Sequence, residues 1–188
     1  MRIERTIHNY AIKGHAARRW YVHARLVVGC LARLTDQPIG RCADVLAITS
    51  PRMSVQRNLK VAYTYLAGQG FMPDVTRSTR IAIQHYESTG EIRGPKTSAF
   101  AKALRGDNNV CVVDSHIARA FGYSEHVARS LYVRVHVTRV VRMIARRQGL
   151  TVAECQACVW AGYYRATFPR GKVPKYRIRE IELDNVPY

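Results

Sequence analysis

Long apolar runs, paired cysteines and acidic residues are all scarce in this chain of 188 residues. No apolar run approaches the roughly 20 residues that a membrane-spanning helix needs, and the opening "MRIERTIHNYAIKGHAARRW" lacks the apolar core of a signal peptide. We therefore expect no membrane partner and a location in the reducing cytoplasm of a bacterial or phage-infected cell. The five cysteines, odd in number and without framework spacing, are typical of free thiols.

The cysteines and histidines also show no metal-binding pattern. Cys155 and Cys158 form a C-x-x-C pair, but no second ligand pair stands nearby, and the seven histidines contain no H-x-x-x-H. On an amphipathic helix this spacing places both thiols on the core face with Val152 and Val159. We expect neither a metal nor a cofactor.

The shortage of acidic residues gives the chain its charge. Only 13 Asp and Glu stand against 30 Lys and Arg, so the formal charge is +17. This excess favours a polyanionic partner, with double-stranded DNA as the leading candidate and a merely basic protein as the alternative. With 47% apolar residues, the chain can bury one hydrophobic core or two small lobes that share a cleft.

Helical periodicity dominates the pattern along the chain. A helix over 16–34 is predicted because apolar residues recur at one-face spacing, at Ala24, Val27, Leu31 and Leu34. Ser54 is expected to cap another helix, and Thr151 with Glu154 forms a capping box. Further helices are predicted over 42–48, 55–66, 76–88, 97–105 and 152–165.

The segment 125–148 is ambiguous, because its valines fit both a strand and a helix. Its length favours a helix, which would carry a basic stripe of His136, Arg139, Arg142 and Arg146. That stripe binds phosphates or is simply a solvated face. We expect one helical domain over 1–166, then a basic tail over 167–188 with a short strand at "YRIREIEL".

The stretch "GPKTSAFAKALRGDNNVCVVDSHIARAFGY" contains two candidate catalytic residues, Lys96 and Asp114. A lysine at the start of a helix meets the positive end of the helix dipole, which would lower its pKa and expose a nucleophilic amine. A carboxylate at the next helix start would remain ionised and could stabilise an electron-poor carbon. The alternative is that Lys96 is a surface residue and Asp114 only an N-cap.

This same stretch resembles the catalytic core of helix-hairpin-helix DNA glycosylases, in particular the endonuclease III-like branch. The resemblance rests on "GPKTSAF" and "VVDSHIARA", with weaker matches at "LAITSPRMSVQRNLKVAYTYL" and "CQACVWAGYYR". It implies that Lys96 forms a Schiff base with the sugar C1′ and that Asp114 is the catalytic carboxylate. The implied fold is mainly α, compact and two-lobed, reduced in size, and without an iron–sulfur cluster because the four-cysteine motif is absent.

The resemblance also implies a DNA-binding surface. A hairpin and catalytic segment would span 90–123, although Ile92 stands where the family hairpin has its first glycine. The loop at 51–54 would fill the gap left by a flipped base, with Met53 as the wedge. The residues expected to contact DNA are Gly94, Thr97, Pro51, Arg52, Met53, Ser54, Arg57, Arg139, Arg142 and Arg146.

Three other residues are candidates for lining the active site: His116, Tyr132 and Trp160. An aromatic ring can stack on an extruded base, but Trp160 also has the spacing of a core residue, and His116 could simply pack against its helix. The chain further resembles small phage-encoded proteins that share "SP", "RN", "GPKTSAF", "VVDSHIARA" and "QACVW".

Three functions follow as hypotheses. The first is a monomeric DNA glycosylase that acts on a flipped damaged or modified base, with lyase activity if Lys96 acts as in the lyase members. The second is a glycosylase-like DNA-binding protein without catalysis. The third is a transferase that modifies bases of phage DNA on the same scaffold, which requires an additional small-molecule pocket.

Overall fold

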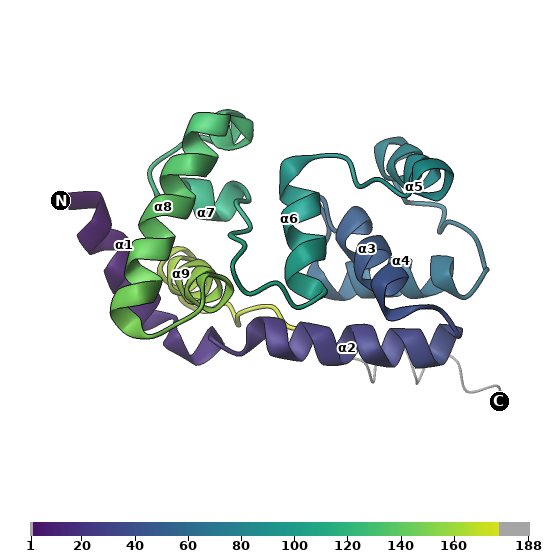
Figure 1. Ribbon diagram of the computed structural model, residues 1–188, viewed down its shortest axis with the longest axis horizontal. Coiled ribbons are helices and arrows are strands. Elements are labelled where there is room, and N and C mark those ends of the chain that lie inside the picture. The colour runs from purple at the N-terminus through teal and green to yellow at the C-terminus, as the bar shows by residue number, and fades with distance from the viewer. Residues whose placement is uncertain (1, 177–188) are drawn as a thin grey trace. The chain divides into compact units, whose positions relative to one another are not determined.

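The computed structural model describes residues 2–176, which are helical and contain no strand (Figure 1). The contacts divide this part of the chain into two units. Residues 2–21 and 106–173 form the first unit, and residues 22–105 and 174–176 form the second. Among the described helices, none is long and apolar enough to cross a membrane.

The first unit is built around one central helix. That helix, α9 (Val152–Thr167), contacts the other three α-helices of the unit and also a 3-10 turn. A second 3-10 segment precedes α8. The other elements are α1 (Arg2–Lys13), η1 (His15–Ala17), α7 (Ser115–Ala120), η2 (Glu125–Arg129) and α8 (Leu131–Gln148).

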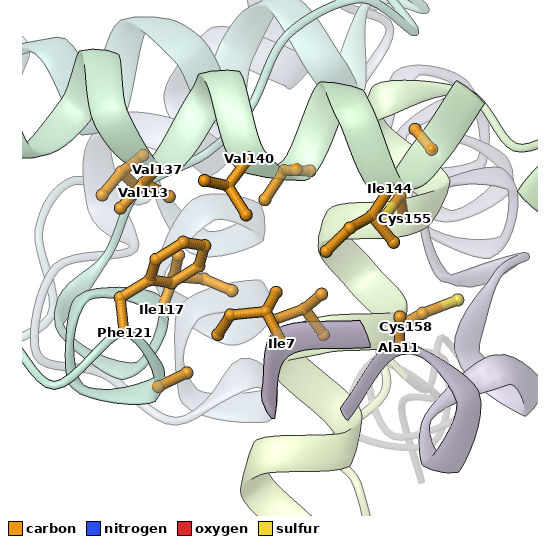
Figure 2. Packing of buried hydrophobic residues seen from close by; sticks show 14 of the residues in the cluster. Ile7, Ala11, Val113, Ile117, Phe121, Val137, Val140, Ile144, Cys155 and Cys158 are labelled. Carbon is orange, nitrogen blue, oxygen red and sulfur yellow. The ribbon is translucent and has the colours of Figure 1, made fainter. Parts of the chain in front are cut away.

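Figure 2 shows the core of the first unit, where side chains from α1, α7, α8 and α9 meet. Ile7, Ile117 and Val137 are fully buried there, and Ile144 is 1% exposed. The burial of Val137 and Ile144 follows from helical spacing, because α8 presents residues three and four apart to the core. The expected core face of α9 is confirmed, since Cys155 and Cys158 lie in this cluster.

The second unit surrounds a helix that is buried over most of its length. α3 is buried continuously from Cys42 to Thr49 and contacts α4, α5 and α6. A helix that is buried on all sides lies inside its unit, so α3 is the centre of this one. The helices of the unit are α2 (Trp20–Thr35), α3 (Ile39–Thr49), α4 (Val55–Leu66), α5 (Arg77–Thr89) and α6 (Pro95–Leu104). The first two residues of α2 belong to the first unit, because the second unit begins at Val22.

One buried carboxylate joins three of these helices. Asp44 of α3 is fully buried, forms an ion pair with Arg105 after α6, and accepts a hydrogen bond from the Tyr86 hydroxyl of α5 at 2.8 Å. Burial and this carboxylate raise the pKa of Tyr86 to about 12. A buried charge of this kind is tolerated only when it is paired and hydrogen-bonded, so Asp44 specifies how α3, α5 and α6 pack.

The helices agree with the sequence expectation, apart from several departures. The helix expected over 16–34 begins at Trp20, after the separate 3-10 turn η1. α1 was not predicted; Leu34 is 45% exposed rather than part of the buried stripe; and the segment from Glu125 begins as a 3-10 turn, with the α-helix starting at Leu131. The expected caps Ser54 and Thr151 are confirmed. The strand expected at 176–183 lies outside the described residues, apart from Tyr176.

Candidate functional site

The segment carrying Lys96, where a hairpin is expected, consists of the loop at 90–94 and the start of α6. α5 ends at Gly90, which has φ 72°, and α6 begins after Gly94, which has φ 87° and is exposed. Both angles lie in the left-handed region that glycine alone adopts readily. Pro95 then occupies the first position of α6, where its missing N–H costs nothing. The two glycines and Pro95 therefore determine the backbone path of this loop and the place where α6 begins.

Lys96 is half-buried at this helix start and its ammonium group is held in place. Nζ donates to Ser50 Oγ at 2.7 Å and lies 5.4 Å from the centroid of the Phe100 ring. Ser50 ends α3, so this hydrogen bond joins two segments 46 residues apart in the sequence. Lys96 is therefore not a freely mobile surface lysine, because both contacts restrict its amine.

The predicted wedge loop lies directly beside that hydrogen bond. After Ser50 the chain passes through exposed Pro51 and Arg52 and half-buried Met53, and the Met53 amide donates to the Ser50 carbonyl at 3.4 Å. Arg52 has φ 61°, a left-handed conformation that a non-glycine residue adopts only at a cost of about 1 kcal/mol or more. Such strain is concentrated at functional sites, and here it lies in a short exposed loop.

Two further residues expected to bind DNA have structural partners. The Ser54 side chain caps α4 by accepting from the Arg57 amide at 3.3 Å, and the Arg57 guanidinium forms an ion pair with Asp74. Arg57 therefore has to exchange this carboxylate for any phosphate. Thr97 is half-buried in the first turn of α6.

The segment carrying Asp114 belongs to the first unit. Val112 and Val113 are each 5% exposed and lead into Asp114, whose Oδ1 accepts from the Ile117 amide at 2.8 Å. Asp114 is thus the N-cap of α7, which was the structural alternative for this residue. An N-cap uses one carboxylate oxygen, so the other oxygen remains available to stabilise positive charge.

His116 and Trp160, expected near the active site, lie in the same unit as Asp114. The His116 ring is 6.5 Å from the Tyr164 ring, and its buried Nδ1 has no hydrogen-bond partner within residues 2–176. Trp160 is partly buried against the core, and its ring lies 5.9 Å from the rings of Trp20 and Tyr164. Trp160 therefore packs against the core, whereas the buried Nδ1 atom of His116 makes no hydrogen bond among the described residues.

The structure places Lys96 in the second unit and Asp114 in the first. Each is ordered by contacts within its own unit: Lys96 by Ser50 and Phe100, and Asp114 by the α7 backbone. The second unit also contains Gly94, Thr97 and the loop at 51–54, and the first unit also contains His116.

The basic stripe on α8 lines a groove of about 1080 Å³ in the first unit. Arg139, Arg142 and Arg146 are all exposed. The sequence interpretation missed the rest of this groove, although the spacing of Leu131, Val135 and Arg139 already places them on one helix face. The lining residues are Glu4, Leu131, Arg134, Val135, His136, Thr138, Arg139, Val140, Arg142, Met143, Arg146 and Arg147.

Tyr132 stands at the start of α8 with 72% of its surface exposed. Its ring stacks on that of His136, with centroids 6.5 Å apart and an interplanar angle of 17°. His136 Nδ1 in turn lies 2.8 Å from the Tyr123 hydroxyl. The His136 ring, expected to belong to the basic stripe, is thus fixed between two tyrosines.

The two thiols of the C-x-x-C pair lie in the core. Within the described part of the chain, no group of His, Cys, Asp and Glu side chains is arranged to hold a metal ion. Burial raises the pKa of Cys155 to about 12 and that of Cys158 to about 11, so both remain protonated at neutral pH. Cysteines of this kind are inert core residues.

A protein family described as "Family of unknown function (DUF7178)" matches residues 9–166 of the chain. No curated protein and no solved structure matches it. The match covers most of both units, including the hairpin, the loop at 51–54, Asp114 and α8. The chain therefore belongs to this family.

Proposed function

We propose that this member of the DUF7178 family is a DNA glycosylase that removes a flipped damaged or modified base. The observation that carries the proposal is the 2.7 Å hydrogen bond from Lys96 Nζ to Ser50 Oγ. It joins the two segments of the second unit by which the sequence resembles helix-hairpin-helix glycosylases, "GPKTSAF" and "LAITSPRM". Two distant segments that resemble one family and also meet in space support a common function.

The hairpin supports a role in DNA binding. The first amides of α6 have no partner within the helix and lie at its positive end, which favours a phosphate. Gly94 is exposed and has no side chain to keep a phosphate away. In this proposal the hairpin holds the DNA backbone, and the strained loop at 51–54 inserts Met53 into the base stack.

Lys96 and Asp114 would then carry the chemistry on the flipped nucleotide. The glycosidic C1′–N bond breaks with its electron pair leaving on the base, and Asp114 stabilises the positive charge that develops on the sugar. The Lys96 amine, once its proton has gone to water, forms the new bond to C1′. The nitrogen then loses a second proton and the C1′–O4′ bond breaks, with O4′ taking a proton, so that the ring-opened sugar is held as a Schiff base. The resulting Schiff base makes strand scission by β-elimination accessible, which is the lyase reaction.

Borohydride trapping tests this proposal directly. Duplex oligonucleotides that carry abasic, oxidised, deaminated or phage-type modified bases are incubated with the protein and reduced, so that a Schiff base becomes a permanent covalent adduct. We expect an adduct with the native protein and none with Lys96→Ala. Lys102→Ala is the matched control, because Lys102 is an exposed lysine of the same helix.

Asp114→Asn separates chemistry from capping. An asparagine also caps a helix, so α7 should persist while base release slows by at least about tenfold, as expected when charge stabilisation is lost. Circular dichroism checks the fold of each variant. An adduct that survives in Lys96→Ala, or no adduct and no base release on any substrate, would contradict the glycosylase proposal.

A non-catalytic DNA-binding protein is the second candidate function. It is favoured by the hydrogen bond of Asp114 to the Ile117 amide, because this contact alone explains the residue. On this hypothesis duplex binding remains salt-sensitive and is unchanged in Asp114→Asn, while no base is released. The same panel of oligonucleotides therefore distinguishes the two functions.

A further inference from the structure

We propose that the groove along α8 binds a single strand of DNA, with its phosphates at the arginines and a base stacked on Tyr132. Choosing DNA over RNA rests on the proposed function, whereas the single-strand site uses neither Lys96 nor Asp114. The site lies entirely within the first unit, between α1 and α8.

The charge of the groove selects a polyanion. Five arginines line it, at positions 134, 139, 142, 146 and 147, against one carboxylate, that of Glu4. Within the part of the chain that the structure describes, no Asp or Glu forms an ion pair with any of the five. Their charges are thus available to a ligand, unlike that of Arg57, which is held by Asp74.

Exposed apolar and aromatic side chains in and beside the groove select a strand whose bases are accessible. Leu131 and Val135 line the groove, and Tyr132 lies beside it, stacked on the lining residue His136. Tyr132, Leu131 and Val135 are 72%, 66% and 57% exposed at the amino-terminal half of α8. A duplex keeps its bases stacked inside and would offer phosphates alone, leaving these three side chains in water. A single strand offers both chemistries, because every base has a face that stacks on an aromatic ring.

The ring of Tyr132 is held in place before any ligand binds. Tyr132 rests on the His136 ring, and His136 is fixed by the Tyr123 hydroxyl at 2.8 Å. Behind them, Val133 and Val137 anchor α8 in the core at 2% and 0% exposure. Because little conformational entropy is lost on binding, an exposed ring fixed in this way is suited to a ligand.

The length of the groove fits a short oligonucleotide. α8 has 18 residues, so at about 1.5 Å per residue it extends over roughly 27 Å. From Arg139 to Arg146 the helix advances by about 10 Å, which places three cations in a row along one face. Non-specific single-strand sites typically cover roughly 4–16 nucleotides.

Fluorescence anisotropy with a labelled oligothymidine of about 12 nucleotides tests the base contact. We expect Tyr132→Ala to weaken binding by about tenfold, the typical effect of losing one stacked base. Tyr132→Phe keeps the ring and should bind as the native protein does. If Tyr132→Ala binds like the native protein while remaining folded, Tyr132 holds no base and the proposal fails.

The salt dependence of the same binding tests the phosphate contacts. Replacing Arg139, Arg142 and Arg146 with glutamine should lower the slope of log K against log salt by about two, since each phosphate contact on a single strand contributes roughly 0.7. The matched control replaces the exposed arginines Arg33, Arg77 and Arg170, which lie outside the groove. That variant loses the same charge and should leave the slope nearly unchanged. Equal slopes in both triple variants would overturn the assignment.

Competition identifies the occupant. Unlabelled oligothymidine should displace the probe at lower concentration than a duplex, an oligouridine of the same length or an acidic peptide such as polyglutamate. Preference for any of these competitors overturns the proposal in favour of that partner. Single-strand binding by a native protein that releases no base and forms no adduct overturns the proposed function alone.

Discussion

A single buried amide connects three segments of the second unit. Asn58 is 1% exposed, and its Nδ2 donates to the Leu46 carbonyl and to the Tyr176 hydroxyl, each at 3.0 Å. Its Oδ1 lies 2.6 Å from Thr49 Oγ1. Removing such an amide costs more than one hydrogen bond, because it deletes three contacts to poorly solvated groups at once.

We predict that Asn58→Ala lowers the free energy of unfolding by about 2–3 kcal/mol, with loss of several buried hydrogen bonds as the cause. Tyr176→Phe deletes a hydroxyl and should cost about 1 kcal/mol. Urea denaturation measures both. Asn109→Ala, at an exposed position, is the control and should stay within about 0.5 kcal/mol of the native value. An Asn58→Ala loss no larger than that of the control would contradict this account of the network.

We predict that two buried thiols make the stability of the protein depend on pH. Burial raises the pKa of Cys155 to about 12 and that of Cys158 to about 11, from a usual value of 9.0. Between about pH 9 and 11 these thiols keep their protons in the folded state and lose them in the unfolded state, so their contribution to stability falls as pH rises.

Alkylation with iodoacetamide at pH 9, read by mass spectrometry, should therefore leave Cys155 and Cys158 unmodified in the native protein. Partly exposed Cys30 should react, and all three should react in urea. Rapid native modification of Cys155 would show that this part of the core opens.

At the scale of elements, α1 and α9 cross at van der Waals contact of their backbones. A Cβ added at Gly162 would lie 2.0 Å from the Tyr10 carbonyl oxygen, and one added at Gly14 would lie 1.8 Å from that of Cys158. Both partners are backbone atoms, which cannot rotate away. The two glycines therefore set the distance between the helices.

Gly162→Ala should accordingly destabilise the protein by about 1–3 kcal/mol, the usual cost of overpacking. Gly29→Ala is the matched control within α2, because a Cβ there meets nothing within 4 Å. Its higher helix propensity should stabilise the protein by roughly 0.5–1 kcal/mol. Thermal unfolding followed by circular dichroism compares the two, and a neutral Gly162→Ala would mean that α1 shifts without cost.

Local sequence signals predicted most helices because their caps and periodicity are local. Ser54 and Thr151 begin helices as expected. The helix α1 was missed because its many charges obscured the spacing of Ile7 and Ala11, both fully buried. Leu34 has the spacing of a core residue and is exposed, since periodicity does not say where the neighbouring helix ends.

At the scale of the whole molecule, the candidate site was only partly predictable. The sequence makes Lys96 and the loop at 51–54 candidates, but nothing local indicates that Ser50 Oγ accepts from Lys96 Nζ. The arginines of α8 were found by spacing, whereas Glu4 joins their groove from 127 or more residues away in the sequence. Tertiary packing creates such partners, so they cannot be deduced from a motif.

The charge of +17 leads to the last prediction. A net charge of this size repels itself in the compact state, and salt screens that repulsion. Raising sodium chloride from low to moderate concentration should therefore increase stability by about 1 kcal/mol, which corresponds to a rise in Tm of roughly 2–4 °C for a chain of this length. Thermal unfolding at several salt concentrations measures the effect. A falling Tm would instead show that attractive pairs such as Arg41–Glu87 and Arg105–Asp44 outweigh the repulsion between the remaining cations.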